Sequence, residues 1–312
     1  MTELIALTGA TGFVGTAVLR ALLKEGRRVR ALSRREGALA PHERLEIVLG
    51  DLSSDTALER LLAGTSAVVH VAGLVKAPDR RSFEAVNVEG TRRLVETAAK
   101  QEPVPRFIYL SSLAAREPGL SAYAASKHGG ELVVQENPAL SDWQILRPPA
   151  VYGPGDRATR SLFQQFARGR CPVPGRGQGR FSLIYVEDLA DAVVALLRHR
   201  IAPGLYELHD GRAGGYDWSD MAAIAARAVG RPVRPVRLPA PVMTAIASVS
   251  SFFSGIVGHT PMLTPGKVRE LCHEDWVARD NLLDEALDWQ PVVRAEQGFA
   301  NAVEWYKAHN WI

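Results

Sequence analysis

Short apolar runs alternate with amphipathic segments through the first half of the chain. In the intervals, apolar residues recur every three or four positions, as in 14–26 and 88–100, which is typical of helices that cover a sheet. Such alternation predicts an α/β fold with a doubly wound parallel sheet. The runs rich in Val, Ile and Leu that we interpret as strands are 4–9, 28–32, 45–50, 67–73, 106–112 and 143–148.

The alternation weakens after Val151. Gly- and Pro-rich loops follow, then helical patterns at 186–199 and 216–230 with a strand-like run at 204–210 between them. We therefore expect a sheet domain over residues 1–150 and a smaller, mostly helical substrate region over 151–312. About 181–210 is expected to return to the sheet domain.

The composition of the chain argues against several classes of function. The 312 residues are 46% hydrophobic and 23% charged, which is ordinary for a globular protein. The net charge is +3 and the basic residues are scattered, so we expect no nucleic-acid partner. Cys171, Cys272 and the histidines have no metal-ligand spacing, and the chain opens without a signal-peptide pattern. We expect a cytoplasmic protein without a metal site.

A segment without Asp, Glu, Lys or Arg extends from 238 to 266. Pro, Ser and Gly interrupt it, so we expect no integral membrane span. A buried or lid helix is the simplest interpretation. Peripheral contact with a membrane or with an apolar substrate stays open as an alternative.

Three glycines follow the first predicted strand, in the segment "TGATGFVG". A dinucleotide site needs glycine for a tight turn, for close approach of the backbone to a pyrophosphate, and for helix–strand packing. The spacing is GxxGxxG rather than GxGxxG, but the flanking strand and helix favour a dinucleotide-binding, Rossmann-type domain. The predicted contact residues of this loop are Gly9, Thr11, Gly12, Phe13, Val14 and Gly15.

The end of the second strand bears on the choice of cofactor. Ser33 stands where an NAD site commonly has an acidic residue, and Arg34 and Arg35 follow it. Two arginines suit the 2′-phosphate of NADP, so NADP is the predicted cofactor, with NAD as second choice. The alternative is that both arginines are solvated surface residues.

Tyr123 and Lys127 are separated by one helical turn, shortly after the strand that ends in Ser111 and Ser112. A lysine ammonium near a tyrosine lowers the pKa of the phenol, which could then exchange a proton with a substrate oxygen near neutral pH. A serine hydroxyl at the strand end can orient the same oxygen. The arrangement suits proton transfer coupled to hydride transfer at a carbinol carbon.

Further motifs occur in order along nearly the whole chain: "GDL" at 50–52, "VVHVAG" at 68–73, "VNVEGT" at 86–91, "LRPPAVYGPGD" at 146–156 and "IYVEDLADA" at 184–192. Together with TGxxGxxG and YxxxK, they give a chain that resembles the extended short-chain dehydrogenases/reductases of the NAD-dependent epimerase/dehydratase family. The resemblance implies an NAD(P)-dependent enzyme with Ser112, Tyr123 and Lys127 as catalytic residues, and Ser111 as the alternative serine.

The resemblance also implies further cofactor contacts. Asp51 and Leu52 would flank the adenine, and Lys127 would bind the nicotinamide ribose as well as act in catalysis. The backbone after Arg147 would meet the carboxamide. The remaining cofactor-side residues that it implies are Ala72, Gly73, Asn87, Ser111, Tyr123 and Pro148.

The sequence leaves the reaction open. Sugar-nucleotide members of the family commonly carry an Arg-Asp pair where this chain has Phe181 and Ser182, although Arg180 or Arg176 could supply the cation. With the charge-free segment, this favours a dehydrogenase or ketoreductase for a lipophilic small molecule. The alternatives are an NDP-sugar epimerase, dehydratase or reductase, and a non-catalytic nucleotide-binding subunit.

The helices predicted near 88–101 and 122–136 carry small or apolar residues on more than one side. A helix with a second apolar stripe commonly meets another helix. We therefore expect a homodimer in which these helices pair across a two-fold axis.

Overall fold

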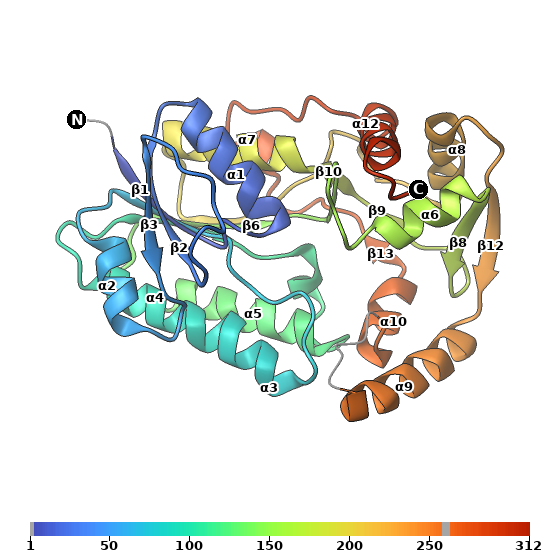
Figure 1. Cartoon of the computed structure of the whole chain (residues 1–312), viewed down its shortest axis with the longest axis horizontal. Helices are drawn as coiled ribbons and strands as arrows, with labels where there is room; N and C mark the ends of the chain where they lie inside the picture. Colours follow the sequence, from blue (N-terminus) through green and yellow to red (C-terminus); the bar gives the residue numbers. More distant parts are fainter. Residues whose placement is uncertain (1–2, 258–262) are drawn as a thin grey trace.

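A seven-stranded, all-parallel sheet forms the centre of the computed structural model, which describes residues 3–257 and 263–312 and the side chains of 3–248 and 263–312 (Figure 1). The predicted doubly wound parallel sheet is confirmed, because chain order reverses beside β1. Across the sheet, the strands are β11 (Gly204–Glu207), β6 (Trp143–Arg147), β5 (Arg106–Leu110), β4 (Ala67–His70), β1 (Leu4–Thr8), β2 (Arg28–Ser33) and β3 (Leu45–Leu49).

Helices cover both faces of this sheet (Figure 1). On one face, α1 (Phe13–Lys24) packs against α7 (Val186–Arg198), which the sequence pattern places at 186–199. On the other face lie α2 (Asp55–Leu62), α4 (Gly90–Ala99) and α5 (Ala122–Gln135). Each face has its own buried apolar cluster, which explains why the central strands β1, β4 and β5 are buried at almost every position.

The helix expected at 88–100 begins earlier than its periodicity indicates. After the short α3 (Arg80–Phe83), the chain forms a π-helical segment at Glu84–Glu89 that continues into α4. Such wide turns disturb the 3.6-residue period and are frequent at functional sites. Similarly, β4 ends at His70, and the residues up to Gly73 form a loop.

A smaller lobe lies over one end of the sheet (Figure 1). Its core is aromatic and includes Tyr152, Phe163, Phe166, Phe299 and Tyr306. Three short parallel pairs join it: β7 (Ala150–Tyr152) with β10 (Leu183–Tyr185), β8 (Arg170–Pro174) with β12 (Arg234–Leu238), and β9 (Arg180–Phe181) with β13 (Asp275–Trp276). The other elements are a 3-10 turn (Leu113–Arg116), α6 (Arg160–Ala167), α8 (Trp218–Val229), α9 (Ala240–Val257), α10 (Pro265–Cys272), α11 (Leu283–Ala286) and α12 (Ala295–Ala308).

Most of the charge-free segment forms α9; residues 258–262 lie outside the described part of the chain. In the first half of this helix, Met243 and Ala247 pack against α10, whereas Val242 and Ile246 are exposed. That half is therefore a surface helix and not the buried helix of the simplest interpretation. Within the described residues, no helix is long and apolar enough to cross a membrane.

Candidate active site

The glycine loop between β1 and α1 has room only for backbone. Gly9 adopts φ 76°, and a Cβ on it would lie 2.6 Å from the backbone nitrogen of Ala72. A Cβ on Gly15 would collide with the carbonyl oxygen of Gly9. No side chain caps α1, and its first turn lacks an acidic residue. The first N–H groups of α1 are therefore free to receive a pyrophosphate, so this loop fits a dinucleotide.

Arg34 and Arg35 are exposed at the end of β2. The buried Ser33 hydroxyl donates to the carbonyl oxygen of Arg35 and so shapes the turn that presents both arginines. A cavity of about 350 Å³, bounded in part by Thr11 and Arg35, lies beside this turn. Hydrogen bonds from Ser53, together with the charge of Arg34, lower the pKa of Asp51. The predicted adenosine-side residues are thus neighbours in space.

Lys127 lies inside the protein, with only 4% of its surface exposed. Its ammonium donates to the carbonyl oxygen of Leu110 at 2.7 Å and lies 4.5 Å from the ring centre of Tyr109. Burial lowers the pKa of Lys127 to about 7, although the charge of Glu131 opposes this lowering. The side chain extends from α5 to the end of β5, near Gly73.

Tyr123 lies one turn before Lys127, at the start of α5. Burial raises the pKa of its phenol to about 12; a hydrogen bond with Ser112 lowers it, and the charge of Glu270 raises it. The expected lowering of this pKa by Lys127 is therefore wrong, because burial outweighs the other effects on the phenol. Ser112 is the serine that contacts Tyr123, and its oxygen also accepts from the backbone nitrogen of Ala114 at 3.2 Å.

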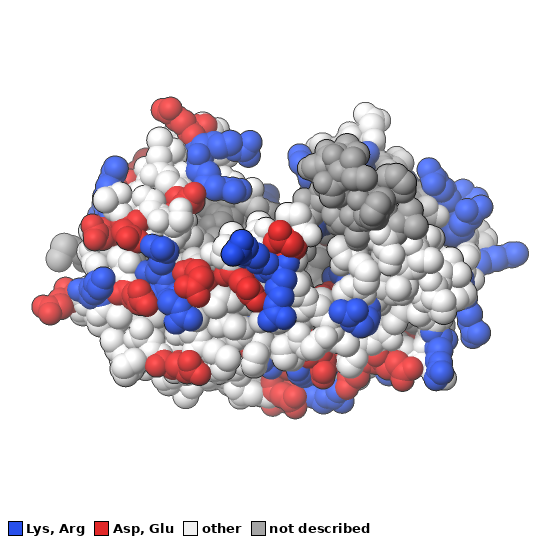
Figure 2. Space-filling view, turned by 90° about the horizontal axis from the view of Figure 1, so that it is seen from below, with Lys and Arg blue, Asp and Glu red and all other residues white. Residues whose placement is uncertain are grey.

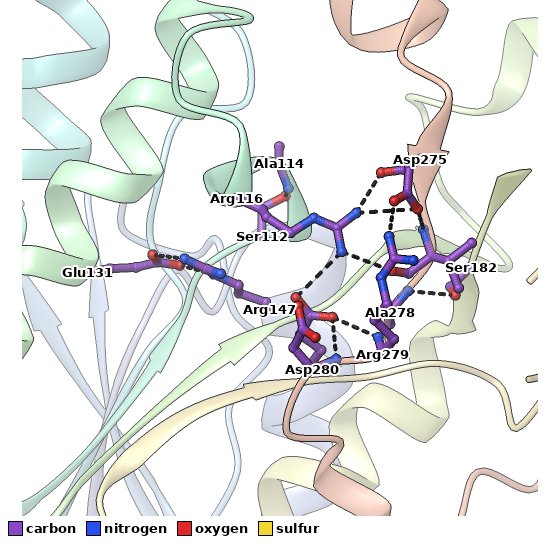
Figure 3. Close-up of polar contacts among 12 residues, drawn as sticks. Ser112, Ala114, Arg116, Glu131, Arg147, Ser182, Asp275, Ala278, Arg279 and Asp280 are labelled. Carbon is purple, nitrogen blue, oxygen red and sulfur yellow. Dashed lines mark hydrogen bonds and ion pairs between the residues drawn. The ribbon is translucent and has the colours of Figure 1, made fainter. Parts of the chain in front are cut away.

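Ser111 has a different partner. Its hydroxyl donates to the Glu131 carboxylate at 2.5 Å, and Arg147 donates to both oxygens of the same carboxylate, at 2.8 and 2.6 Å. Glu131 is 1% exposed. These buried contacts tie the end of β5 to α5 and β6, and Figure 3 shows the pair of Glu131 and Arg147. Sequence reasoning missed Glu131; its position one turn after Lys127 was the available signal.

Asn87 lies in the π-helical segment and is 1% exposed. Its side-chain oxygen accepts from the backbone nitrogen of Leu74 at 2.7 Å, while its amide donates to the Leu74 carbonyl and to the Ser126 hydroxyl, both at 2.9 Å. Asn87 therefore fixes the loop after β4 against α5.

The remaining predicted cofactor-side residues line the same edge of the sheet or support it. The backbone nitrogen of Ala72 donates to Thr8, Gly73 lies against Asn87, and the buried Leu52 packs on Gly90. The carbonyl oxygen of Pro148 accepts from the backbone nitrogen of Leu113.

A second buried network connects the lobes (Figure 3). Arg116 donates to the carbonyl oxygens of Val277 and Asp275, at 2.9 and 2.5 Å. It lies 3.8 Å from the fully buried carboxylate of Glu207, which also accepts from the backbone nitrogen of Arg279 at 2.8 Å. Arg116 follows Ser112 by one helical turn, so the network positions the loop that carries the serine. No local pattern in the sequence indicates this pairing.

Glu270 brings α10 to the start of the catalytic helix. Its buried carboxylate accepts from the hydroxyl of Ser121, the N-cap of α5, and from the ammonium of Lys267 at 2.8 Å. Its charge also raises the pKa of Tyr123. The helix α10 therefore packs beside the start of α5, close to Tyr123. No cluster of His, Cys, Asp or Glu among the described residues could hold a metal ion.

Comparison with known proteins agrees with this geometry. The model of the NAD dependent epimerase/dehydratase family matches residues 5–208. The chain belongs to this family. It is an NAD-dependent enzyme of the extended short-chain dehydrogenase/reductase type, which confirms the resemblance seen in its motifs.

The proteins that this chain resembles are named for different substrates. A ceramide reductase of Caulobacter vibrioides is 40% identical over 311 residues, covering 99% of this chain and 96% of the relative. A UDP-glucose 4-epimerase of Vibrio cholerae is 26% identical and covers 97% of this chain and 95% of its own. The crystal structure of a Bacillus cereus UDP-glucuronic acid 4-epimerase in complex with NAD superposes with TM-score 0.75 at 20% identity, covering 98% and 99% of the two chains. That likeness shows the fold alone.

Proposed function

We propose that the protein reduces a carbonyl group of a ceramide-type lipid to a secondary alcohol, with NADP(H) as the preferred cofactor. The observation that carries this proposal is the 40% identity to a ceramide reductase over almost the whole chain, combined with the Ser112–Tyr123–Lys127 cluster. The charge-free helix α9 packs on α10, which contacts the start of α5, and this agrees with a lipophilic substrate.

In the proposed reaction, Gly9, Gly12 and Gly15 hold the pyrophosphate, and Lys127 holds the nicotinamide ribose. When bound, the reduced nicotinamide supplies a hydride. The Ser112 hydroxyl donates a hydrogen bond to the substrate carbonyl oxygen, and Tyr123 transfers its phenolic proton to that oxygen. The carbonyl carbon gains the hydride and its oxygen gains the proton, so the products are the alcohol and the oxidised cofactor.

The raised pKa of Tyr123 suits a proton donor in this direction, because the phenol stays protonated at neutral pH. Lys127, with a pKa of about 7, can return a proton to the phenolate. Ser111 has the supporting role in this scheme, since its hydroxyl is bound to Glu131.

Two surface arginines support the preference for NADP. Arg34 and Arg35 form no ion pair with any described residue, and Arg35 lines, together with Glu36, the cavity that a 2′-phosphate would enter. Ser33 offers no carboxylate to a ribose 2′-hydroxyl. An arginine at this place stabilises a phosphate through charge-assisted hydrogen bonds.

The sugar-nucleotide alternative has less support. Arg180, which could replace the missing diphosphate-binding arginine, donates to the carbonyl oxygens of Gly214 and Gly215 at 2.8 and 3.0 Å. Ser182 is buried and accepts from the backbone nitrogen of Ala278. The exposed Arg176 is the remaining arginine of the two that could bind a diphosphate.

The test compares substrates directly. The protein is mixed either with NADPH and the ketone form of a ceramide, or with the oxidised cofactor (NAD⁺ or NADP⁺) and a UDP-hexose, and the consumption of NADPH and the products are followed. We expect turnover with the ketone lipid, and no change and no tight binding with the UDP-hexose. Conversion of the UDP-hexose without turnover of the lipid would favour the epimerase alternative. If neither substrate reacts, and Tyr123→Phe binds the dinucleotide as tightly as wild type does, the protein is better explained as a nucleotide-binding subunit.

A further inference from the structure

An arginine-rich, acid-free stretch surrounds α9 in the sequence. From Met221 to Arg269 the chain carries six basic residues and no Asp or Glu. Arg234 and Arg237 lie on β12, whose five residues are all exposed. Neither arginine forms an ion pair with a described residue, so their charges face solvent. Acidic groups of the same lobe therefore do not neutralise this surface.

Exposed apolar side chains lie next to these arginines. On β12, Val236 and Leu238 are 41% and 36% exposed. On α9, Val242 and Ile246 are 52% and 58% exposed and share one side of the helix, since they are one turn apart. Met243 and Ala247 form a neighbouring stripe that packs against α10. In the view from below, the described part of the lobe on the right presents white atoms, with blue atoms along its outer edge and red atoms at its lower edge (Figure 2).

We propose that β12 and the first half of α9 dock on the surface of a membrane that contains anionic phospholipids. The apolar side chains of α9 would enter the boundary between headgroups and acyl chains, and Arg234 and Arg237 would contact the phosphates. An apolar helix beside unpaired arginines fits this partner better than a second copy of the chain, because a copy would bring the same positive charges against these.

The docking surface is connected to the candidate active site. α9 packs on α10, and the Glu270 carboxylate of α10 binds Ser121, two residues before Tyr123. A docked membrane would therefore lie one helix away from the start of the catalytic helix, which suits a long-chain substrate. This consequence rests on the proposed function, whereas the docking itself does not.

The experiment is cosedimentation of the full chain with vesicles of phosphatidylcholine, alone or with about one third phosphatidylglycerol. We expect binding to the anionic vesicles that weakens as salt rises. Arg234→Gln with Arg237→Gln should weaken it roughly twenty-five-fold, at about fivefold per arginine. Val242→Ser with Ile246→Ser should also reduce binding. The matched control is Arg28→Gln with Arg60→Gln, two exposed arginines of the other lobe, which should bind like wild type.

Two outcomes would overturn the proposal. One is absence of binding to anionic vesicles, or binding that neither pair of substitutions weakens. The other is a dimer in light scattering that Val242→Ser with Ile246→Ser dissociates, without vesicle binding, because the surface would then serve a second copy. Reduction of a detergent-dispersed ketone lipid by the same samples tests the activity separately. Wild-type protein that reduces the dispersed lipid but does not bind anionic vesicles would contradict the docking alone and leave the proposed function intact.

Discussion

Replacing Lys127 by Met should stabilise the cofactor-free protein while abolishing its activity. Burial lowers the pKa of Lys127 from 10.5 to about 7. A tenfold change in a protonation equilibrium corresponds to ~1.4 kcal/mol, so the buried lysine costs about 4 kcal/mol of folding free energy near pH 7. The substitution also leaves the carbonyl oxygen of Leu110 without its donor, which costs about 1–3 kcal/mol. We expect a net gain of about 2 kcal/mol at that pH.

The pH dependence gives the sharper test. Above the unfolded-state pKa of Lys127, the side chain is neutral in both states and carries no desolvation penalty. As the pH falls towards 7, the unfolded chain takes up a proton that the folded protein does not, so the penalty grows and is complete below about 7. The advantage of Lys127→Met over wild type should therefore shrink by about 2 kcal/mol between about pH 7 and about pH 9.

The measurement is urea unfolding of both proteins, without cofactor, at several pH values. Lys100→Met is the matched control, because Lys100 is exposed on the surface beyond α4; its effect should be small and independent of pH. If the difference in free energy of unfolding between Lys127→Met and wild type does not vary with pH, Lys127 is not a buried lysine with a lowered pKa. The same conclusion follows if the variant is less stable than wild type at every pH.

The remaining predictions concern catalysis, cofactor, packing and assembly. Tyr123→Phe should lower kcat at least about a hundredfold with the dinucleotide Kd nearly unchanged; residual kcat above about a tenth of wild type would contradict it. Arg34→Ala should raise the Kd of NADP about tenfold and hardly change that of NAD, whereas equal weakening of both would make Arg34 structural. In urea unfolding, Glu131→Ala should lower the free energy of unfolding by about 3–5 kcal/mol, because Arg147 stays buried without its partner. Glu136 is exposed just beyond the same helix, and Glu136→Ala should lower the free energy of unfolding by less than about 0.5 kcal/mol. Light scattering at micromolar concentration should give a dimer mass; a fully active monomer would rule out pairing of α4 and α5.

The parallel sheet could be predicted because most of its strands are short, mainly apolar runs and the helices between them have one apolar face. Both patterns follow from burial between two layers and need no knowledge of distant contacts. The glycine loop could also be predicted, because each of its glycines is required by local steric constraints. The pair β8–β12 was missed because the exposed "RPVRL" run has no alternation of buried and exposed positions.

The candidate site was only partly predictable, because pairings between distant residues leave no local signal. Tyr123 and Lys127 share a helix turn, so their spacing revealed them. By contrast, the bond between Ser121 and Glu270 joins residues far apart in the chain, and their meeting depends on how the second lobe folds back. The predicted lowering of the Tyr123 pKa also failed, since this pKa depends on burial, which spacing cannot give.

The central claim is hydride transfer to a carbonyl carbon of a ceramide-type lipid. The most direct measurement supplies NADPH that carries deuterium at the transferable position and analyses the lipid product by mass spectrometry. We expect an alcohol product with one deuterium on the carbinol carbon, formed by wild type and not by Tyr123→Phe. A lipid recovered without deuterium, or labelled equally by both proteins, would contradict it.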